Sequence, residues 1–460
     1  MPNAQHSRLA LATALLAVVL NSCAEYTPRK QPHQVFQRGE NWTHAPSWAA
    51  ASIRQDWWTT YRDARLNARI ATALSNNPDL RILATRLERA RAQIRQAAAA
   101  SWPVINAGTA LVYGTEQTRM TMFTPTDLEP WASSAEISWE LDLFGKIRAA
   151  TRSAQEAGGA AFWDLHAGRL LIAAQVAEAH FRLLRLNEEK ALIADSVAAN
   201  RHIVETMRDR ESAGLVSTTE LRRQEAEHQR LERALLDLDR LRGLANLQLA
   251  TLLGRATPPT PPAGTLHAVR TPPLPARTTS AVLRMRPDLL AAEARVRSAF
   301  QLEESTRLNL LPSLSLGAGA RGESSALASG FREWMASVGP RLDVPIYDQR
   351  RLAAVRVRRA ETDLAAATYR KTALGAFEEV ESAYLNFVNR LRQHAAARRE
   401  VTALDEARRN TLATFQAGLV SQIELLESER RFLEGRRQEL AVRHTLLRSH
   451  LALIKALGGS

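Results

Sequence analysis

Apolar residues recur with helical spacing through two long tracts of the chain, residues 149–254 and 352–457. In the first tract they follow the three-and-four spacing that is typical of a coiled-coil seam. That seam consists of Val176, Ala179, Leu183, Leu186, Ile193, Val197 and Val204, interrupted by Lys190 and Asn200. Each tract is broken once, so each predicts a helical hairpin with arms of roughly 50 to 60 residues, on the order of 80 Å long.

The two breaks share the sequence Ala-Gly-Leu-Val-Ser, which has the chemistry of a turn between helices. Its glycine can take the left-handed conformation that ends a helix. Ser217 with Glu220, and Ser421 with Glu424, have the spacing of a capping box that starts the returning helix. The predicted turn residues are Gly214, Leu215, Val216 and Ser217 in the first hairpin and Gly418, Leu419, Val420 and Ser421 in the second.

Shorter segments alternate apolar and polar residues with period two, which predicts strands. Residues 131–143 carry apolar side chains on one face and serine, glutamate and aspartate on the other. Residues 313–321 and 334–346 alternate in a similar way. Each half of the chain therefore has two strands between an opening helix of about 25 residues and a long hairpin.

These strands have properties of membrane strands. They are about ten residues long, the length that a tilted strand needs to cross a bilayer. Trp102, Trp131 and Trp334 lie near strand ends, where the aromatic girdles of membrane proteins are found. Because four strands cannot close a barrel, a membrane location requires several copies of the chain. The alternative is an ordinary half-buried antiparallel sheet, which is the commoner source of such alternation.

The second half of the chain repeats the first. A Pro-Asp-Leu sequence opens a helix at Pro78 and again at Pro287, and in both cases a further proline follows 25 residues later. The Ala-Gly-Leu-Val-Ser turn recurs with a displacement of 204 residues. Residues 256–277 contain seven prolines and predict a linker. We therefore place a first repeat at 76–255 and a second at 278–460.

The beginning of the chain predicts export. The apolar run from Leu9 to Leu20 would cover roughly 18 Å as a helix, too short for a bilayer core of about 30 Å. It is typical of a signal peptide, which we place at 1–22. Residues 23–75 then form an N-terminal periplasmic segment.

Cys23 is the predicted site of lipid attachment. The sequence Leu20-Asn21-Ser22-Cys23 resembles the bacterial lipobox, in which the cysteine carries diacylglycerol and an N-palmitoyl chain after cleavage. Cys23 is also the only cysteine among the 460 residues, so it has no disulfide partner in the chain. Ala24 after it points to the outer membrane by analogy with bacterial sorting rules. A plain secretory signal with an incidental cysteine is the alternative.

The formal net charge of +13 does not by itself indicate binding to nucleic acid. The arginines are spread along helical stretches and interleaved with glutamates, which is typical of solvated helix faces. No apolar run of 18 or more residues follows the signal, so we expect no membrane-spanning helix.

Motifs for catalysis or cofactor binding are weak. Residues 317–322 have the glycine spacing of a dinucleotide fingerprint, but they lie inside an alternating strand. The eleven histidines show no HExxH spacing. Met120 and Met122 could contact soft metal ions, although such a pair more often serves loop packing. We expect no enzyme, no cofactor beyond the lipid and no metal site.

Several short motifs stand at the predicted ends of helices and strands. They are Asp56-Trp57-Trp58 with Tyr61-Arg62-Asp63, the two Pro-Asp-Leu sequences, Glu140-Leu141-Asp142-Leu143-Phe144-Gly145-Lys146, Val344-Pro345-Ile346-Tyr347-Asp348 and both Ala-Gly-Leu-Val-Ser turns. Together they resemble the outer membrane factor family of efflux channels, the group around TolC and OprM, and its NodT-like lipoprotein branch. The resemblance covers nearly all of the chain after the signal.

The resemblance implies a mostly α-helical chain with a transmembrane β portion. Three chains would build a 12-stranded outer-membrane β-barrel, continued by a 12-helix coiled-coil α-barrel through the periplasm. The homotrimer would be a passive exit duct for small molecules such as drugs, toxic compounds or metal ions. Its partners would be outer-membrane lipid, an inner-membrane pump of the RND type and a periplasmic adaptor (membrane fusion) protein, which would contact the turns at 213–217 and 417–421.

The resemblance also implies a periplasmic gate made of acidic rings. The matching positions are Glu424 and Glu427, one helical turn apart, whereas the first repeat has Glu220 and Arg223 there. Threefold symmetry would bring six carboxylates near one axis, which would attract cations and raise the carboxylate pKa values. The alternative is that Glu424 only caps its helix and Glu427 faces solvent.

Two other functions fit parts of the pattern. A type I secretion exit duct shares this fold but passes proteins from an ABC exporter. A periplasmic structural coiled-coil lipoprotein without a pore would have the signal and the helices. Such a protein would not need four amphipathic strands.

Overall fold

The computed structural model describes residues 43, 56–111, 131–273, 285–324 and 333–459. The chain divides into two compact units. The first unit holds the described parts of Arg86–Phe162 and Ala291–Arg370, and the second holds those of Val35–Thr85, Trp163–Leu290 and Lys371–Ser460.

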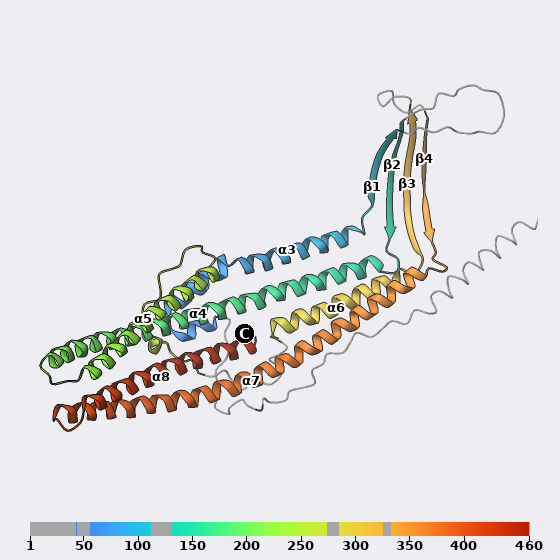
Figure 1. Cartoon of the computed structure of the whole chain (residues 1–460). Helices are drawn as coiled ribbons and strands as arrows, with labels where there is room; N and C mark the ends of the chain where they lie inside the picture. Colours follow the sequence, from blue (N-terminus) through green and yellow to red (C-terminus); the bar gives the residue numbers. More distant parts are fainter. Residues whose placement is uncertain (1–42, 44–55, 112–130, 274–284, 325–332, 460) are drawn as a thin grey trace, which may run out of the picture. The chain divides into compact units, whose positions relative to one another are not determined.

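The first unit contains one four-stranded antiparallel sheet, whose strands lie side by side in the order β1-β2-β3-β4 (Figure 1). In the register, Ile137 of β2 lies opposite both Ile105 of β1 and Ala318 of β3, and Ala318 lies opposite Val338 of β4. Because side chains alternate along a strand, this register brings most of the apolar residues of the four strands to one face. The strands are β1 (Val104–Leu111), β2 (Trp131–Leu141), β3 (Ser313–Ser324) and β4 (Glu333–Asp343).

The two outer strands, β1 and β4, each pair on one side only within this sheet. Pro340 lies in β4 opposite Leu316 of β3. A proline has no N–H to donate, and such a residue is tolerated in a strand at the edge of a sheet. One chain therefore presents two open strand edges.

Two helices begin shortly after an aspartate that stands between a strand and the helix. The Asp142 carboxylate accepts hydrogen bonds from the backbone N–H groups of Ile147 at 3.0 Å and Arg148 at 2.9 Å. Asp348 accepts one from the backbone N–H of Arg350 at 2.9 Å. These bonds satisfy free N–H groups in the first turns of α4 (Lys146–Ser212) and α7 (Gln349–Gln416). The helices α3 (Pro78–Ala99) and α6 (Pro287–Leu308) precede the strands of each repeat.

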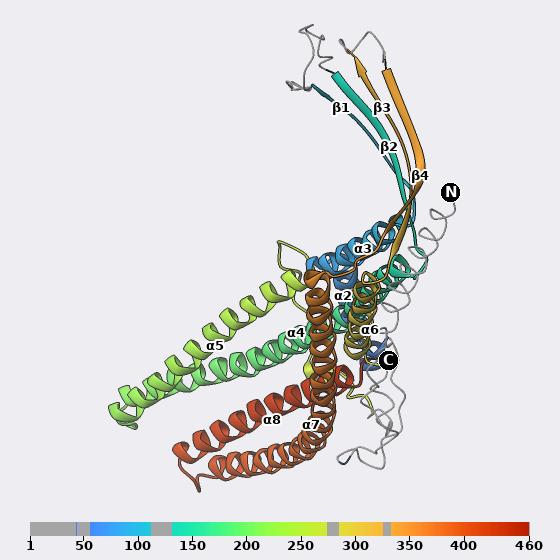
Figure 2. The ribbon, with the colours of Figure 1, turned by 90° about the vertical axis from the view of Figure 1, so that its right-hand side faces the viewer.

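The second unit contains two helical hairpins. In both views α5 (Thr218–Leu252) returns along α4, and α8 (Gln422–Ala456) returns along α7 (Figure 2). All seven predicted seam residues are buried, from Val176 to Val204. Most of them share one core with Leu231 and Leu238 of α5 and with Leu440 and Leu447 of α8. The predicted coiled-coil seam is therefore confirmed.

The prediction of hairpin arms of 50 to 60 residues is wrong. α4 has 67 residues and α7 has 68, whereas α5 and α8 have 35 each. At 1.5 Å per residue the long arms extend about 100 Å and the short arms about 50 Å. α5 is short because the chain turns after Leu253, where Gly254 has a φ of 67° and the proline-rich linker follows.

Three shorter elements pack into the second unit: η1 (Trp57–Tyr61), α2 (Ala64–Asn76) and η2 (Leu266–Ala268). The Tyr61 hydroxyl lies 2.7 Å from Nδ1 of His450, and the Asp63 carboxylate lies 2.8 Å from Nε2 of His180. These contacts attach the segment before the first repeat to α8 and α4.

Candidate gate and docking site at the hairpin turns

Both hairpin turns end their first helix in the same way. Gly214 and Gly418 have φ values of 73° and 74°, a conformation that favours glycine. In the first turn the Gly214 N–H donates to the Glu211 carbonyl at 2.9 Å, and the Leu215 N–H donates to the Arg210 carbonyl at 2.8 Å. The second turn repeats both bonds at 2.9 and 3.0 Å. This is the Schellman pattern, which satisfies carbonyls at the end of a helix.

Serine residues then start the returning helices. The Ser217 hydroxyl accepts from the Glu220 N–H at 3.2 Å, and the Glu220 carboxylate accepts from the Ser217 N–H at 3.4 Å. The predicted capping box is thus confirmed in the first turn. In the second turn the Ser421 hydroxyl accepts from the Glu424 N–H at 3.3 Å, but the reciprocal bond from the Glu424 carboxylate is not formed, so only half of the predicted capping box is present there.

The turns present apolar side chains to solvent. Leu215 is 75% exposed and Leu419 is 77% exposed. Val216 behaves differently, because it packs against a small buried cluster of Val204, Met207 and Leu221. A leucine held exposed on a well-defined turn is suited to contact with another protein.

A groove of about 850 Å³ lies between the two hairpins on the side of the turns. Val216, Ser421 and Glu427, three of the predicted site residues, line it. Its other apolar side chains include Ile203, Met207, Leu231, Ile423, Phe432 and Leu433. Both hairpins thus contribute to one concave and partly apolar surface.

Glu427 is paired with arginines of its own helix. Its carboxylate accepts from Arg430 at 2.9 and 3.0 Å and from Arg431 at 3.1 Å. These hydrogen bonds, first those from Arg430 and then that from Arg431, lower the pKa of Glu427. The predicted rise of the carboxylate pKa values concerns an assembled ring of three chains, and it stays a prediction.

Part of the positive charge at the groove comes from residues that the sequence analysis did not single out. The Arg408 guanidinium lies 4.9 Å from the centre of the Phe432 ring and 3.2 Å from the Glu429 carboxylate. The spacing of three and four residues after Glu427 could have indicated its partners Arg430 and Arg431. No such signal exists for the contacts of Arg408, which join α7 to α8.

The predicted interface tryptophans lie where strands meet other segments. Trp102 stands two residues before β1 and is exposed. Trp131 is the first residue of β2, and Trp334 is the second residue of β4. Trp131 pairs with Ser324, and Trp334 pairs with Gly322, so both lie toward the same end of the sheet. Their contact with membrane lipid stays a prediction.

Other predicted features lie outside the described residues or are not seen within them. Cys23, Met120 and Met122 fall in segments that the structure does not describe. In the described part of the chain, no group of three or more histidine, cysteine, aspartate or glutamate residues is arranged to hold a metal ion. Across the same residues, no helix is both long and apolar enough to cross a membrane.

A family model described as "Outer membrane efflux protein" matches residues 70–255 and 278–459. The match occurs once in each half of the chain, which confirms the predicted duplication. It also supports the resemblance drawn from the short motifs.

Individual proteins show the same likeness along most of the chain. The pyoverdine export outer membrane protein OpmQ of Pseudomonas aeruginosa is 28% identical over 420 residues, covering 89% of this chain and 88% of the relative. The probable outer membrane lipoprotein SilC of Salmonella typhimurium is 25% identical over 466 residues, covering 98% and 99%. The crystal structure of the CmeC outer membrane channel of Campylobacter jejuni superposes with a TM-score of 0.80 at 20% identity, covering 94% of each chain. The fold is therefore that of an outer-membrane channel.

Proposed function

The chain belongs to the outer membrane efflux protein family, and on this premise we propose that it forms the exit duct of an efflux system for small molecules. The family consists of outer-membrane transport proteins and not of enzymes. The observation that carries the proposal is the sheet, whose four strands share one apolar face and leave two edges open. A sheet of this kind is suited to meet lipid on one face once its edges are paired.

We assign the edge pairing to three copies of the chain. β4 of one copy would pair with β1 of the next, so that three sheets close a barrel of 12 strands and remove every open edge. A strand of 11 residues, the length of β2 and β4, spans about 36 Å when untilted. At the tilt of membrane strands, this length matches an apolar band about 25 Å tall.

The hairpins would continue this duct into the periplasm. Their long arms extend about 100 Å, which is more than a compact domain needs. Helices of this length are suited to reach across an aqueous gap. The exposed leucines Leu215 and Leu419 and the groove beside them support contact with a periplasmic adaptor at the turns. An inner-membrane pump of the RND type would then supply the cargo and choose it.

We further propose that Cys23 carries the lipid. Its position in the lipobox-like sequence supports this, as does the likeness to SilC, which is described as a probable outer membrane lipoprotein. The mass of the mature N-terminal peptide tests the proposal, and an unmodified cysteine or a cleavage elsewhere would contradict it.

The channel itself is tested with purified full-length protein. We expect trimers that resist heat on gels and that give discrete single-channel currents in planar bilayers. A monomer that stays in water after removal of the lipid, with no conductance, would overturn the proposal.

The gate is tested by replacing both acidic residues, Glu424→Ala and Glu427→Ala. We expect the resting leak current of the trimer to rise several-fold, because the acidic ring that the gate proposal places at the constriction is lost. The duplication offers a matched control: Arg223→Ala changes the position of the first hairpin that is equivalent to Glu427, and it should leave the leak unchanged. Equal leak in wild type and in the Glu424/Glu427 variant would contradict the gate assignment.

A further inference from the structure

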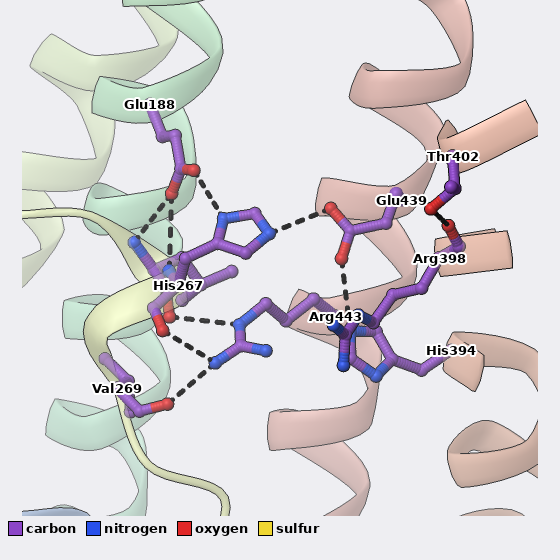
Figure 3. A network of polar contacts seen from close by, with 9 residues as sticks. Glu188, His267, Val269, His394, Arg398, Thr402, Glu439 and Arg443 are labelled. Carbon is purple, nitrogen blue, oxygen red and sulfur yellow. Dashed lines mark hydrogen bonds and ion pairs between the residues drawn. The ribbon is translucent and has the colours of Figure 1, made fainter. Parts of the chain in front are cut away.

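A short piece of the linker between the repeats, residues 265–269, makes polar contacts with both hairpins inside the second unit. Glu188 of α4 accepts a hydrogen bond from the Leu266 N–H at 2.8 Å and contacts Nδ1 of His267. On its other side, Nε2 of His267 lies 2.9 Å from the Glu439 carboxylate of α8. Figure 3 shows His267 between these two glutamates.

The backbone of the same piece is bound to the second hairpin. Arg443 of α8 donates to the carbonyl oxygens of Leu266 at 3.1 Å, His267 at 3.0 Å and Val269 at 2.8 Å (Figure 3). The second oxygen of Glu439 lies 3.1 Å from Nε2 of His394 on α7. The contacts therefore run from α4 through the linker to α8 and on to α7. We call Glu188, His267, His394, Glu439 and Arg443, with the linker residues that they hold, the linker brace.

Charge makes this brace stronger than a set of neutral hydrogen bonds. Both ring nitrogens of His267 face a carboxylate, and the two can donate hydrogen bonds at the same time only when the ring is an imidazolium. The Glu188 and Glu439 side chains are 11% and 5% exposed. A carboxylate removed from water to this degree needs a charged partner, and loss of that partner leaves a costly unpaired charge.

The brace lies where the packing of the hairpins changes. Leu186, two residues before Glu188, and Leu440, next to Glu439, belong to the tight apolar core. The lining of the 850 Å³ groove begins only a few residues further toward the turns, at Leu192 and Arg436. Arg437 adds a direct link at this level, 3.0 Å from Glu189 of α4. Among the described residues, the brace and the neighbouring Arg437–Glu189 pair are thus the polar contacts between the two hairpins that lie nearest the more open part.

Distance from the brace magnifies any movement at the turns. Ser212, the end of α4, lies 24 residues beyond Glu188, which is about 36 Å along a helix. A small change of the angle between hairpins at the brace therefore produces a larger displacement at Leu215 and Leu419.

We propose that the linker brace sets the spacing of the two hairpins and so holds the turn end of the resting channel closed. This inference rests on the proposed function as an exit duct. His267 and Arg443 act as positioning residues, because they fix the hairpins to each other and need not touch the cargo. When the brace is broken, the parts of the two hairpins between the brace and the turns are free to separate.

The test uses full-length trimers carrying His267→Ala or Arg443→Ala. We expect the resting leak in planar bilayers to rise about fivefold or more, the scale of a typical coupling between sites, with no change in the conductance of the open state. Arg443→Lys retains a cation and should bring the leak back toward the wild-type value. His202→Ala is the matched control, because His202 lies on α4 beyond the brace and its side chain is 85% exposed.

Amide hydrogen exchange provides a readout that does not depend on conductance. Both variants should exchange faster in residues 192–212 and 422–433, while His202→Ala exchanges like wild type. If wild-type trimers conduct and neither variant changes the resting leak, the brace proposal is overturned. Unchanged hydrogen exchange in both variants would also overturn it. If the wild-type protein shows no conductance, the proposed function as a duct is refuted instead. Hydrogen exchange in the variants then still tests whether the brace holds the hairpins together. If His267→Ala does not assemble, His267→Gln is measured by the same criteria.

Discussion

The charge state of a glutamate in this protein depends on which residues face it. Glu427 and Glu439 stand on the same helix, α8. Arginines of that helix lower the pKa of Glu427. At Glu439, burial alone would raise the pKa, but hydrogen bonds from His267 and His394 outweigh it and lower the pKa. The first carboxylate is therefore kept charged by arginines at the surface of its own helix, whereas the second is kept charged by histidines in the interior of the unit.

His267 gives the brace a defined dependence on pH. Its hydrogen bond to Glu188 and then its bond to Glu439 raise its pKa from 6.5 to about 9. A raised pKa means that its stabilising contribution is fully present below pH 6.5 and is lost as the pH rises through 9. Arg443 and His394, the other charged or titratable groups of the brace, stand on α8 and α7. The brace therefore stays charged at neutral pH.

We predict that His267→Gln destabilises the protein more at pH 6 than at pH 10. The difference should be about 1 kcal/mol, since water screens a side chain that is one-third exposed. Denaturant unfolding of wild type and variant, followed by helical circular dichroism at the two pH values, measures it. An equal effect of the substitution at both values would show that the imidazolium is not formed.

At the scale of elements, the hairpins depend on turns whose backbone favours one residue type. Gly418 has a φ of 74° with no atom near the place where a Cβ would stand, so only the backbone conformation resists substitution. Gly243 in α5 also has open space around it, but it lies in an ordinary helix where alanine is preferred. The two glycines thus form a matched pair with opposite expectations.

We predict that Gly418→Ala lowers the free energy of unfolding by about 1 kcal/mol, because alanine resists the left-handed conformation. Gly243→Ala should raise it by about 0.5 to 1 kcal/mol. Denaturant unfolding of the two variants beside wild type measures both. A loss of stability in both variants would argue against the turn conformation as the cause.

At the scale of the whole molecule, the open strand edges and the shared apolar face require further copies of the chain. Val338 in the middle of β4 is 86% exposed in one chain, and the residue before it, Ser337, points to the opposite face. A soluble protein rarely leaves such a face uncovered. Lipid outside a closed barrel would cover it.

We predict that Val338→Lys sharply reduces the yield of heat-resistant trimers in the outer-membrane fraction. A lysine on the lipid face near the bilayer midplane costs about 2–4 kcal/mol. The control is Ser337→Lys, which places the same charge on the face that would line the lumen and should leave assembly near wild type. Equal yields of the two variants would contradict the assignment of the faces.

The sequence by itself determined the elements and their order. Helical and strand periodicity, capping serines and turn glycines act between residues a few positions apart, so Ser217, Gly418 and the seam of α4 could be recognised directly. The repeat was visible for the same reason, because each half carries the same local signals. The family motifs at Asp142 and Asp348 correspond to helix starts whose bonds the structure shows.

Only the tertiary structure decided how distant segments meet. The register of β2 with β3 and the groove between the hairpins required the folded chain. His267 lies 79 residues from Glu188 and 172 from Glu439, and no periodic pattern links positions so far apart. Packing of whole helices brings such residues together, which is why a proline-rich segment predicted as a linker also proved to join the two hairpins.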